Sequence, residues 1–197
     1  YLPHLLRSIC KKNNSKLIHI STDCVFNGKK GGYAELDSRD GIGLYAETKK
    51  LGEIIDDSNI TLRSSIIGPE LKSKGNGLFQ WFITQDSDVQ GYTNSIWSGV
   101  TTIELAKAIK WAIDNEITGL YHITNGYFIN KYELLKLFKK YSNSPILITP
   151  IDGKTHDKSF IDSRKDISYK IPSYEQMVKQ MIIDIKSNHK KYNYKNI

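Results

Sequence analysis

Cysteine and long hydrophobic runs are both scarce in this chain. Its 197 residues include only two cysteines, Cys10 and Cys24, which excludes a disulfide framework and a zinc site built from several thiolates. We therefore expect reduced thiols and a cytoplasmic protein. No apolar run approaches the roughly 20 residues that a membrane-spanning helix needs, so no membrane association is expected.

Metal-binding patterns are lacking as well. The five histidines show no spacing typical of metal ligands, so no metal site is expected; they are His4, His19, His122, His156 and His189. With 39% hydrophobic residues and 14 glycines, the composition is that of an ordinary globular protein, which excludes collagen-like and wholly disordered chains.

Positive charge is in excess, with 28 Lys and Arg against 21 Asp and Glu, a net charge of +7. Much of this excess lies near the end of the chain, where no acidic residue follows Asp184; the lysines concerned are Lys186, Lys190, Lys191 and Lys195. Other lysines share a predicted helix with an acidic residue, as Lys136 does with Glu133. This distribution indicates solvated faces and a frayed basic tail, and we expect no nucleic-acid partner.

The chain begins with Tyr1 and not with Met. Apolar residues then recur at helical spacing, at Leu2, Leu5, Leu6 and Ile9, without the basic start and long apolar core of a signal peptide. We therefore expect the sequence to be a fragment that starts at or inside an amphipathic helix.

Predicted strands alternate with predicted helices along the whole chain. Strands are expected over residues 16–22, 60–67, 120–123 and 145–151, and helices over 44–57, 78–83, 101–115, 131–141 and from 173 onward. Capping patterns support three of these helix starts, at Thr101, Asn130 and Ser173. In the helix from 101, we expect Ile103, Ala106, Ile109 and Ile113 to form one apolar side. The alternation predicts an α/β fold with a mainly parallel sheet.

Three residues with complementary chemistry occur early in the chain. Thr22 ends the first predicted strand, and open α/β sheets bind ligands at the carboxyl ends of their strands. Tyr45 and Lys49 lie one turn apart on the following helix and therefore share a face. A phenol is a weak acid at neutral pH, but an adjacent ammonium stabilises its phenolate. Such a phenol can protonate a carbonyl oxygen while hydride reaches the carbon, and a hydroxyl group can hold the same oxygen.

The segments around these residues carry a family resemblance. They are Ile20-Ser21-Thr22-Asp23-Cys24-Val25-Phe26-Asn27-Gly28, Tyr33-Ala34-Glu35-Leu36-Asp37, Tyr45-Ala46-Glu47-Thr48-Lys49-Lys50-Leu51-Gly52-Glu53 and Leu62-Arg63-Ser64-Ser65. Together they resemble the extended short-chain dehydrogenase/reductases, and within them the dTDP-4-dehydrorhamnose reductase family and related sugar-nucleotide reductases. The segment Trp97-Ser98-Gly99-Val100-Thr101-Thr102 resembles the point where that family re-enters its sugar-binding lobe.

The resemblance implies a fold and an activity. The expected fold is the C-terminal part of a Rossmann-type, doubly wound parallel sheet (residues 1–68), followed by a smaller sugar-binding α/β lobe with returning Rossmann elements (69–186) and a basic tail (187–197). The implied activity is reduction of a 4-keto nucleoside-diphosphate sugar by NADPH or NADH, for deoxysugar and surface-polysaccharide biosynthesis. A homodimer is left open as a further partner.

The resemblance also implies roles for individual residues. Thr22, Tyr45 and Lys49 would be catalytic. Tyr45 and Lys49 would also bind the cofactor, together with Ser21, Ile66, Ile67 and Gly68. Substrate contacts would come from Asp23, Cys24, Val25, Phe26, Trp97 and Arg164. The residues alone leave three of these open. Asp23 could equally cap a turn, Trp97 precedes a turn and is equally open as a substrate contact, and Arg164 could be a surface residue instead of a diphosphate clamp.

The sequence departs from the family pattern at three points. Ala46 stands where the family has Gly after the Tyr, and Cys24 stands where it commonly has an aromatic residue. The Gly-rich dinucleotide fingerprint, which should open the first strand–helix unit of the fold, is absent from this sequence. The run Gly28 to Gly32 is not this fingerprint, because it does not open that unit and no helix follows it directly. By family analogy, about the first two or three strand–helix units of a Rossmann half are expected to be missing, and with them the residue that selects NAD or NADP.

Two other functions remain open at this point. The resemblance extends to a non-catalytic regulatory subunit of methionine adenosyltransferase, against which the intact Thr22, Tyr45 and Lys49 set weighs. Sugar-nucleotide epimerases and dehydratases share the same set. Dehydratases usually add acidic residues beside the hydroxyl position, and Asp23 alone does not decide for them.

Overall fold

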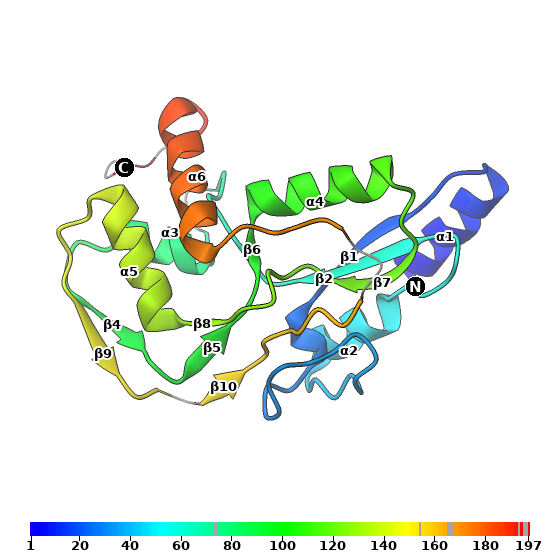
Figure 1. Cartoon of the computed structure of the whole chain (residues 1–197), viewed down its shortest axis with the longest axis horizontal. Helices are drawn as coiled ribbons and strands as arrows, with labels where there is room; N and C mark the ends of the chain where they lie inside the picture. The colour runs from blue at the N-terminus through cyan, green and yellow to red at the C-terminus, as the bar shows by residue number, and fades with distance from the viewer. Residues whose placement is uncertain (73–74, 154, 165–167, 193, 195–196) are drawn as a thin grey trace.

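The computed structural model describes residues 1–72, 75–153, 155–164, 168–192, 194 and 197, and it has an α/β fold with two lobes (Figure 1). The first lobe is built on a parallel sheet in the order β1 (Ile18–Thr22), β2 (Ile60–Ser64) and β7 (Gly119–His122). Thr22 is in register with Ser64, and Arg63 with His122, so the carboxyl ends of all three strands lie at one edge. The α/β class with parallel strands is therefore as the sequence predicted.

Helices lie on both sides of this sheet (Figure 1). The helix α4 (Thr102–Asp114) covers one side and α2 (Leu44–Gly52) the other. The first helix, α1 (Leu2–Lys12), lies beside α2, where His4 Nε2 is 2.6 Å from the carbonyl oxygen of Leu51. All four apolar residues of the α1 stripe are exposed.

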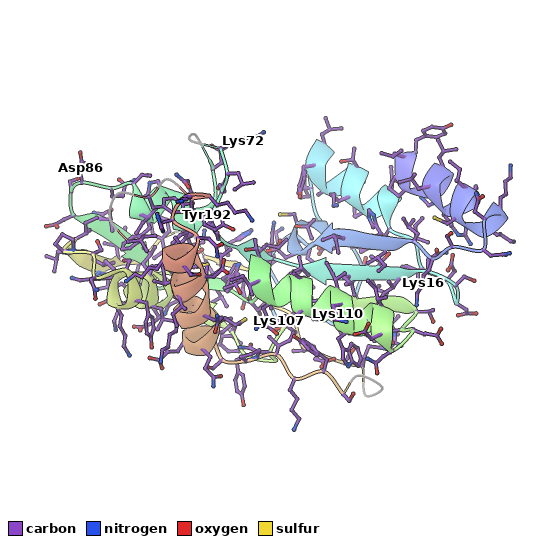
Figure 2. The ribbon with its side chains drawn as sticks, turned by 90° about the horizontal axis from the view of Figure 1, so that it is seen from above. Lys16, Lys72, Asp86, Lys107, Lys110 and Tyr192 are labelled. Carbon is purple, nitrogen blue, oxygen red and sulfur yellow. The ribbon has the colours of Figure 1, made fainter. Side chains whose placement is uncertain are left out.

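The second lobe contains the short strands and the remaining helices. The strands β4 (Val89–Tyr92) and β9 (Ile148–Ile151) pair in parallel, and β5 (Ser95–Trp97) lies between β8 (Ile129–Asn130) and β10 (His156–Asp157). The helices α3 (Leu78–Ile83), α5 (Lys131–Ser142) and α6 (Tyr174–Ser187) enclose its core. Figure 2 shows the two lobes from above, with Asp86 in the second lobe and Lys16 in the first.

The lobes are joined by a two-stranded parallel ladder. The strand β3 (Ile66–Ile67) leaves the first sheet just after β2 and pairs with β6 (Val100–Thr101), which leads directly into α4. Residue Ser65 separates β2 from β3, because its backbone carbonyl accepts from Val100 N and its hydroxyl accepts from Trp97 Nε1. The single strand predicted over 60–67 is therefore two strands that belong to different sheets.

Two other predicted boundaries differ from the structure. The helix expected over 44–57 ends at Gly52, because Glu53 is extended and its carboxylate is drawn to Arg63 on β2. The strand expected over 145–151 begins at Ile148, after Asn143 has ended α5 in a left-handed conformation with φ of 58°. At Glu53 the change of direction allows a buried carboxylate to form its hydrogen bonds. At Asn143 it allows the end of α5 to form a hydrogen-bonded cap.

The buried face of α4 is also different from the predicted one. Leu105, Ala108 and Ala112 are buried, whereas Ile113 is more than half exposed. Small alanine side chains allow the helix to approach the strands closely, and the isoleucines Ile103 and Ile109 lie at the margins of the contact.

The tail after α6 packs on the second lobe at Tyr192, Tyr194 and Ile197, whereas residues 188–191 are exposed. The Tyr194 hydroxyl donates to Gln80 Oε1 at 2.6 Å and accepts from the backbone nitrogen of Glu70 at 2.8 Å. Tyr192 also packs against the core of the second lobe (Figure 2). Lys195, assigned above to the basic tail, lies outside the described residues.

Membrane-spanning helices and clusters of metal ligands are both absent from the described residues. No helix in this part of the chain has the length and apolar character required to cross a membrane. Within the same residues, no three His, Cys, Asp or Glu side chains are grouped so that they could hold a metal ion.

Candidate active site

Thr22 lies at the carboxyl end of β1, as the sequence predicted, and caps the short 3-10 helix η1 (Asp23–Val25). Its hydroxyl oxygen accepts from the backbone nitrogen of Cys24 at 3.2 Å and donates to Asp23 Oδ1 at 3.0 Å. These two bonds fix the position of the oxygen at the edge of the sheet. Asp23 therefore contacts the proposed catalytic hydroxyl directly.

Tyr45 and Lys49 come to this strand from α2. Tyr45 is in the first turn of the helix and its side chain is 60% exposed, so the phenol is accessible. One turn later, the Lys49 ammonium donates to the backbone carbonyl of Ile20 at 2.8 Å. Because Ile20 is two residues before Thr22, this bond attaches the Tyr–Lys face of α2 to the strand that carries the hydroxyl.

A buried ionic cluster, which the sequence analysis did not identify, lies directly beside these groups. Glu53 and Arg63 are almost completely buried and form two hydrogen bonds, of 2.7 and 2.8 Å. The same carboxylate accepts from the Ser21 hydroxyl at 2.6 Å and from Arg39 at 3.0 Å. Burial alone would raise the pKa of Glu53, but Arg63, Ser21 and Arg39 together hold it below its usual value. The signal for this cluster in the sequence was Arg63, a charged residue within a predicted strand whose other residues are typical of buried positions.

This cluster extends to β7 through His122. Arg63 Nη1 is 3.2 Å from His122 Nε2, and the ring stacks on Phe160 with centroids 4.0 Å apart. The His122 backbone nitrogen donates to Glu35 Oε1 at 3.0 Å, and the Ser163 hydroxyl donates to Glu35 Oε2. Burial lowers the pKa of His122 to about 4, and the nearby Glu35 carboxylate offsets this only in part. The ring is therefore neutral at physiological pH.

The residues expected to contact the cofactor differ in burial, and not all of them have accessible side chains. The Ser21 hydroxyl is bonded to Glu53 and faces the buried cluster. Ile66 is 43% exposed just beyond the carboxyl edge of β2, whereas the Ile67 side chain is buried. Gly68 is packed against Thr102, where an added Cβ would come within 2.4 Å of the Thr102 hydroxyl oxygen. Of Ser21, Ile66 and Ile67, only Ile66 has an exposed side chain.

Two residues expected to bind substrate are instead part of a small core, which corrects their assignment. Val25 and Phe26 are fully buried. The Phe26 ring stacks on Tyr33 at a centroid distance of 4.2 Å, and the Arg63 guanidinium lies 5.2 Å from it. Neither side chain offers a surface to a ligand. The partly exposed Cys24 remains beside Thr22.

Trp97 and Arg164 are not placed with Thr22 either. Trp97 is buried, donates to Ser65 Oγ at 2.8 Å and packs against Tyr174, so it joins the two lobes. Arg164 donates to the carbonyl of Leu120 and lies over the Tyr121 ring, with its guanidinium 4.0 Å from the centroid. That position is near the start of β7, and Thr22 is at the opposite edge of the sheet. The geometry does not favour a diphosphate clamp at Arg164.

A parallel sheet with a strand-end hydroxyl and an adjoining Tyr-x-x-x-Lys helix is the arrangement that the resemblance to the short-chain dehydrogenase/reductases predicts, in a fold of Rossmann type. Comparison with known proteins agrees. Residues 2–67 match the family model described as the RmlD substrate binding domain. The chain is 26% identical over 157 residues to a dTDP-4-keto-6-deoxy-D-glucose reductase of Streptomyces niveus, covering 74% of this chain and 53% of that relative. It thus spans about half the length of this curated relative.

Solved structures have the same fold. A dTDP-4-dehydrorhamnose reductase from Bacillus anthracis in complex with NADP matches with a TM-score of 0.76 and 22% identity, over 89% of this chain and 67% of that one. A hypothetical dTDP-4-dehydrorhamnose reductase from Sulfolobus tokodaii matches with a TM-score of 0.71 and 27% identity, over 88% and 66%. A UDP-N-acetylglucosamine 4-epimerase from Methanobrevibacter ruminantium reaches a TM-score of 0.75 at 18% identity, over 94% and 67%. The predicted resemblance is confirmed: over residues 2–67 the sequence matches this family model, and the curated and solved proteins above to which the chain is similar include dTDP-sugar reductases.

Proposed function

We propose that this chain carries the catalytic hydroxyl, phenol and ammonium of an NAD(P)H-dependent reductase that acts on a 4-keto nucleoside-diphosphate sugar. The observation that carries the proposal is the 2.8 Å bond from Lys49 to Ile20, because it attaches the Tyr–Lys helix to the end of the strand that bears Thr22. The family match supports the substrate class. We also propose the domain division expected above, with residues 1–68 as the Rossmann remainder and 69–186 as the substrate lobe.

The roles of the three residues follow from their chemistry. Tyr45 donates its phenolic proton to the keto oxygen of the sugar. The Thr22 hydroxyl turns from Asp23 to donate a second hydrogen bond to that oxygen, which stabilises the developing negative charge. Lys49 stabilises the phenolate that remains on Tyr45. Reduced nicotinamide, when bound, supplies the hydride for the carbonyl carbon.

The residues present fit one end of such a cofactor. An ammonium has three N–H donors, so the bond from Lys49 to Ile20 leaves capacity for ribose hydroxyls. Ile66 offers an apolar surface just beyond the same edge of the sheet. The pyrophosphate end needs a Gly-rich turn at a helix N-terminus, and this sequence contains no such fingerprint.

The test is consumption of NADPH by the intact protein with a dTDP-4-keto-6-deoxy sugar. We expect stoichiometric oxidation of NADPH. A dehydratase or epimerase regenerates its cofactor within each cycle and would show no net consumption, and a regulatory subunit would show no reaction. Each of these results would overturn the proposal.

The phenol is tested by Tyr45→Phe. Removing only the hydroxyl should lower kcat by about 10²- to 10⁴-fold, the usual contribution of a positioned general acid. Tyr192→Phe is the matched control, because Tyr192 lies in the other lobe beyond α6 (Figure 2), and it should leave turnover unchanged. Full turnover in Tyr45→Phe would show that another group donates the proton.

A further inference from the structure

We infer that Glu53 is a positioning residue, which fixes α2, and with it Tyr45 and Lys49, against the end of β1 that carries Thr22. This inference rests on the proposed function, because it concerns the alignment of that same site. Glu53 follows the last residue of α2 and is completely buried as a side chain.

Two positions at the end of α2 face β1. Tyr45 and Lys49 lie one turn apart on the same side of α2, and Glu53 is the extended residue directly after the helix, four positions beyond Lys49. Lys49 bonds to the carbonyl of Ile20, and Glu53 bonds to the hydroxyl of Ser21. The last turn of α2 and the residue that follows the helix are thus attached to two successive residues of β1, immediately before Thr22.

Arg63 makes this attachment rigid. It lies on β2 in register with Ser21 and holds both oxygens of the Glu53 carboxylate in a planar fork. The same guanidinium donates to the carbonyl of Glu35 at 3.0 Å. Any shift of Glu53 would separate two buried charges, and so the end of α2 has a single favourable position.

The physical chemistry of buried ion pairs indicates why such a cluster matters here. The free energy needed to remove two charges from water offsets most of their mutual attraction, so the pair adds little net stability. Its geometry is nevertheless sharply defined. A displacement of about 1 Å at a reacting group can lower a rate by about 100-fold. In the other ion pair of this helix, Glu47 with Lys50, the Glu47 carboxylate is more than half exposed and both partners belong to α2.

Ser21→Ala is the first test, because it removes the attachment to β1 and leaves the Glu53–Arg63 pair intact. We expect kcat for NADPH-dependent reduction to fall at least about 10-fold, with KM for NADPH and for the sugar nucleotide changed less than about threefold. Glu47→Gln is the matched control on the same helix and should leave both constants unchanged. A normal kcat in Ser21→Ala, or a loss expressed only in KM, would overturn the inference.

A second test separates positioning from stability. Glu53→Gln leaves the Arg63 charge without its partner and is expected to unfold at lower denaturant concentration. The double variant Glu53→Gln/Arg63→Met removes both charges, so its unfolding midpoint should return toward that of the unaltered protein. Its kcat should stay at least about 10-fold low. Recovery of kcat together with the midpoint would show that the pair serves stability alone.

A third measurement does not depend on turnover. If the unaltered protein reduces no sugar nucleotide, the proposed function fails, and amide hydrogen exchange then decides on Glu53. Ser21→Ala should raise exchange at the α2 amides of residues 48–52 several-fold, while α6 and the Glu47→Gln protein keep their normal rates. Equal α2 exchange in Ser21→Ala and the unaltered protein would overturn the inference.

Discussion

At the scale of single residues, polar side chains form a row across the sheet near the carboxyl ends of its strands. Ser21, Arg63 and His122 stand in register on β1, β2 and β7 and point to the side of the sheet where Glu53 and Phe160 pack. His122 Nδ1 is 3.3 Å from the carbonyl of Ile161, so its proton belongs on Nδ1 and the Nε2 lone pair accepts from Arg63. This arrangement requires a neutral ring.

His122 should make stability depend on pH. Its pKa is about 4 in the fold and 6.5 in the unfolded chain, so between these values the unfolded state binds more protons. The free energy of unfolding should therefore fall, by up to about 3 kcal/mol, as the pH is lowered from above 6.5 to 4. Urea unfolding of the intact protein at several pH values measures this.

His122→Gln should flatten that dependence, because the group that takes up the proton on unfolding is gone. His189→Gln, at an exposed position after α6, should keep the slope of the unaltered protein. An unchanged slope in His122→Gln would assign the effect to other groups.

At the scale of elements, the helix starts and most helix ends follow the sequence closely, whereas the end of α2 and the buried face of α4 do not. Asn130 accepts from the backbone nitrogen of Glu133, and Ser173 forms a reciprocal capping box with Gln176. At Thr101 only half of the predicted box is seen, because the Glu104 carboxylate accepts from the hydroxyl of Tyr169. Capping uses side chains within one turn, so it is visible in sequence, whereas the partner of Glu104 is 65 residues away.

Ser173→Ala tests the contribution of the α6 cap. The change frees the backbone nitrogen of Gln176 at the start of α6, and it should lower the free energy of unfolding by about 1 kcal/mol. Chemical denaturation of the intact protein measures the loss. Ser187→Ala, at the exposed other end of the helix, should cost much less, and equal losses in the two variants would contradict a role for the cap.

At the scale of the whole molecule, β1 is an edge strand and α1 shows its apolar stripe to solvent. In the described part of the chain, β1 pairs with β2 alone. An open strand edge next to an exposed apolar helix face favours association with other chains. The same side of the sheet is where a Rossmann fold would continue toward its pyrophosphate-binding turn.

We predict that these 197 residues by themselves neither bind NADPH tightly nor reduce a sugar nucleotide. The residues at the site can address the nicotinamide end only, because the sequence has no glycine turn to receive the pyrophosphate. Titration of the isolated chain with NADPH, followed by an assay of turnover, measures this. Micromolar binding with turnover would show that a complete dinucleotide site is present after all.

The sequence by itself determined the α/β class and the helix starts, and it suggested the set of Thr22, Tyr45 and Lys49. These depend on local spacing, on capping and on side-chain chemistry that any extended strand or helix displays. Tertiary structure alone decided that Val25, Phe26 and Trp97 are buried and that Arg164 lies over Tyr121. It also decided that α2 ends just before Glu53, whose carboxylate bonds to Arg63. Those outcomes depend on partners from 10 to more than 40 residues away, which compete for each side chain once the sheet has assembled. The local sequence pattern therefore indicates which interactions a side chain is able to make, and the tertiary packing determines which of them it does make.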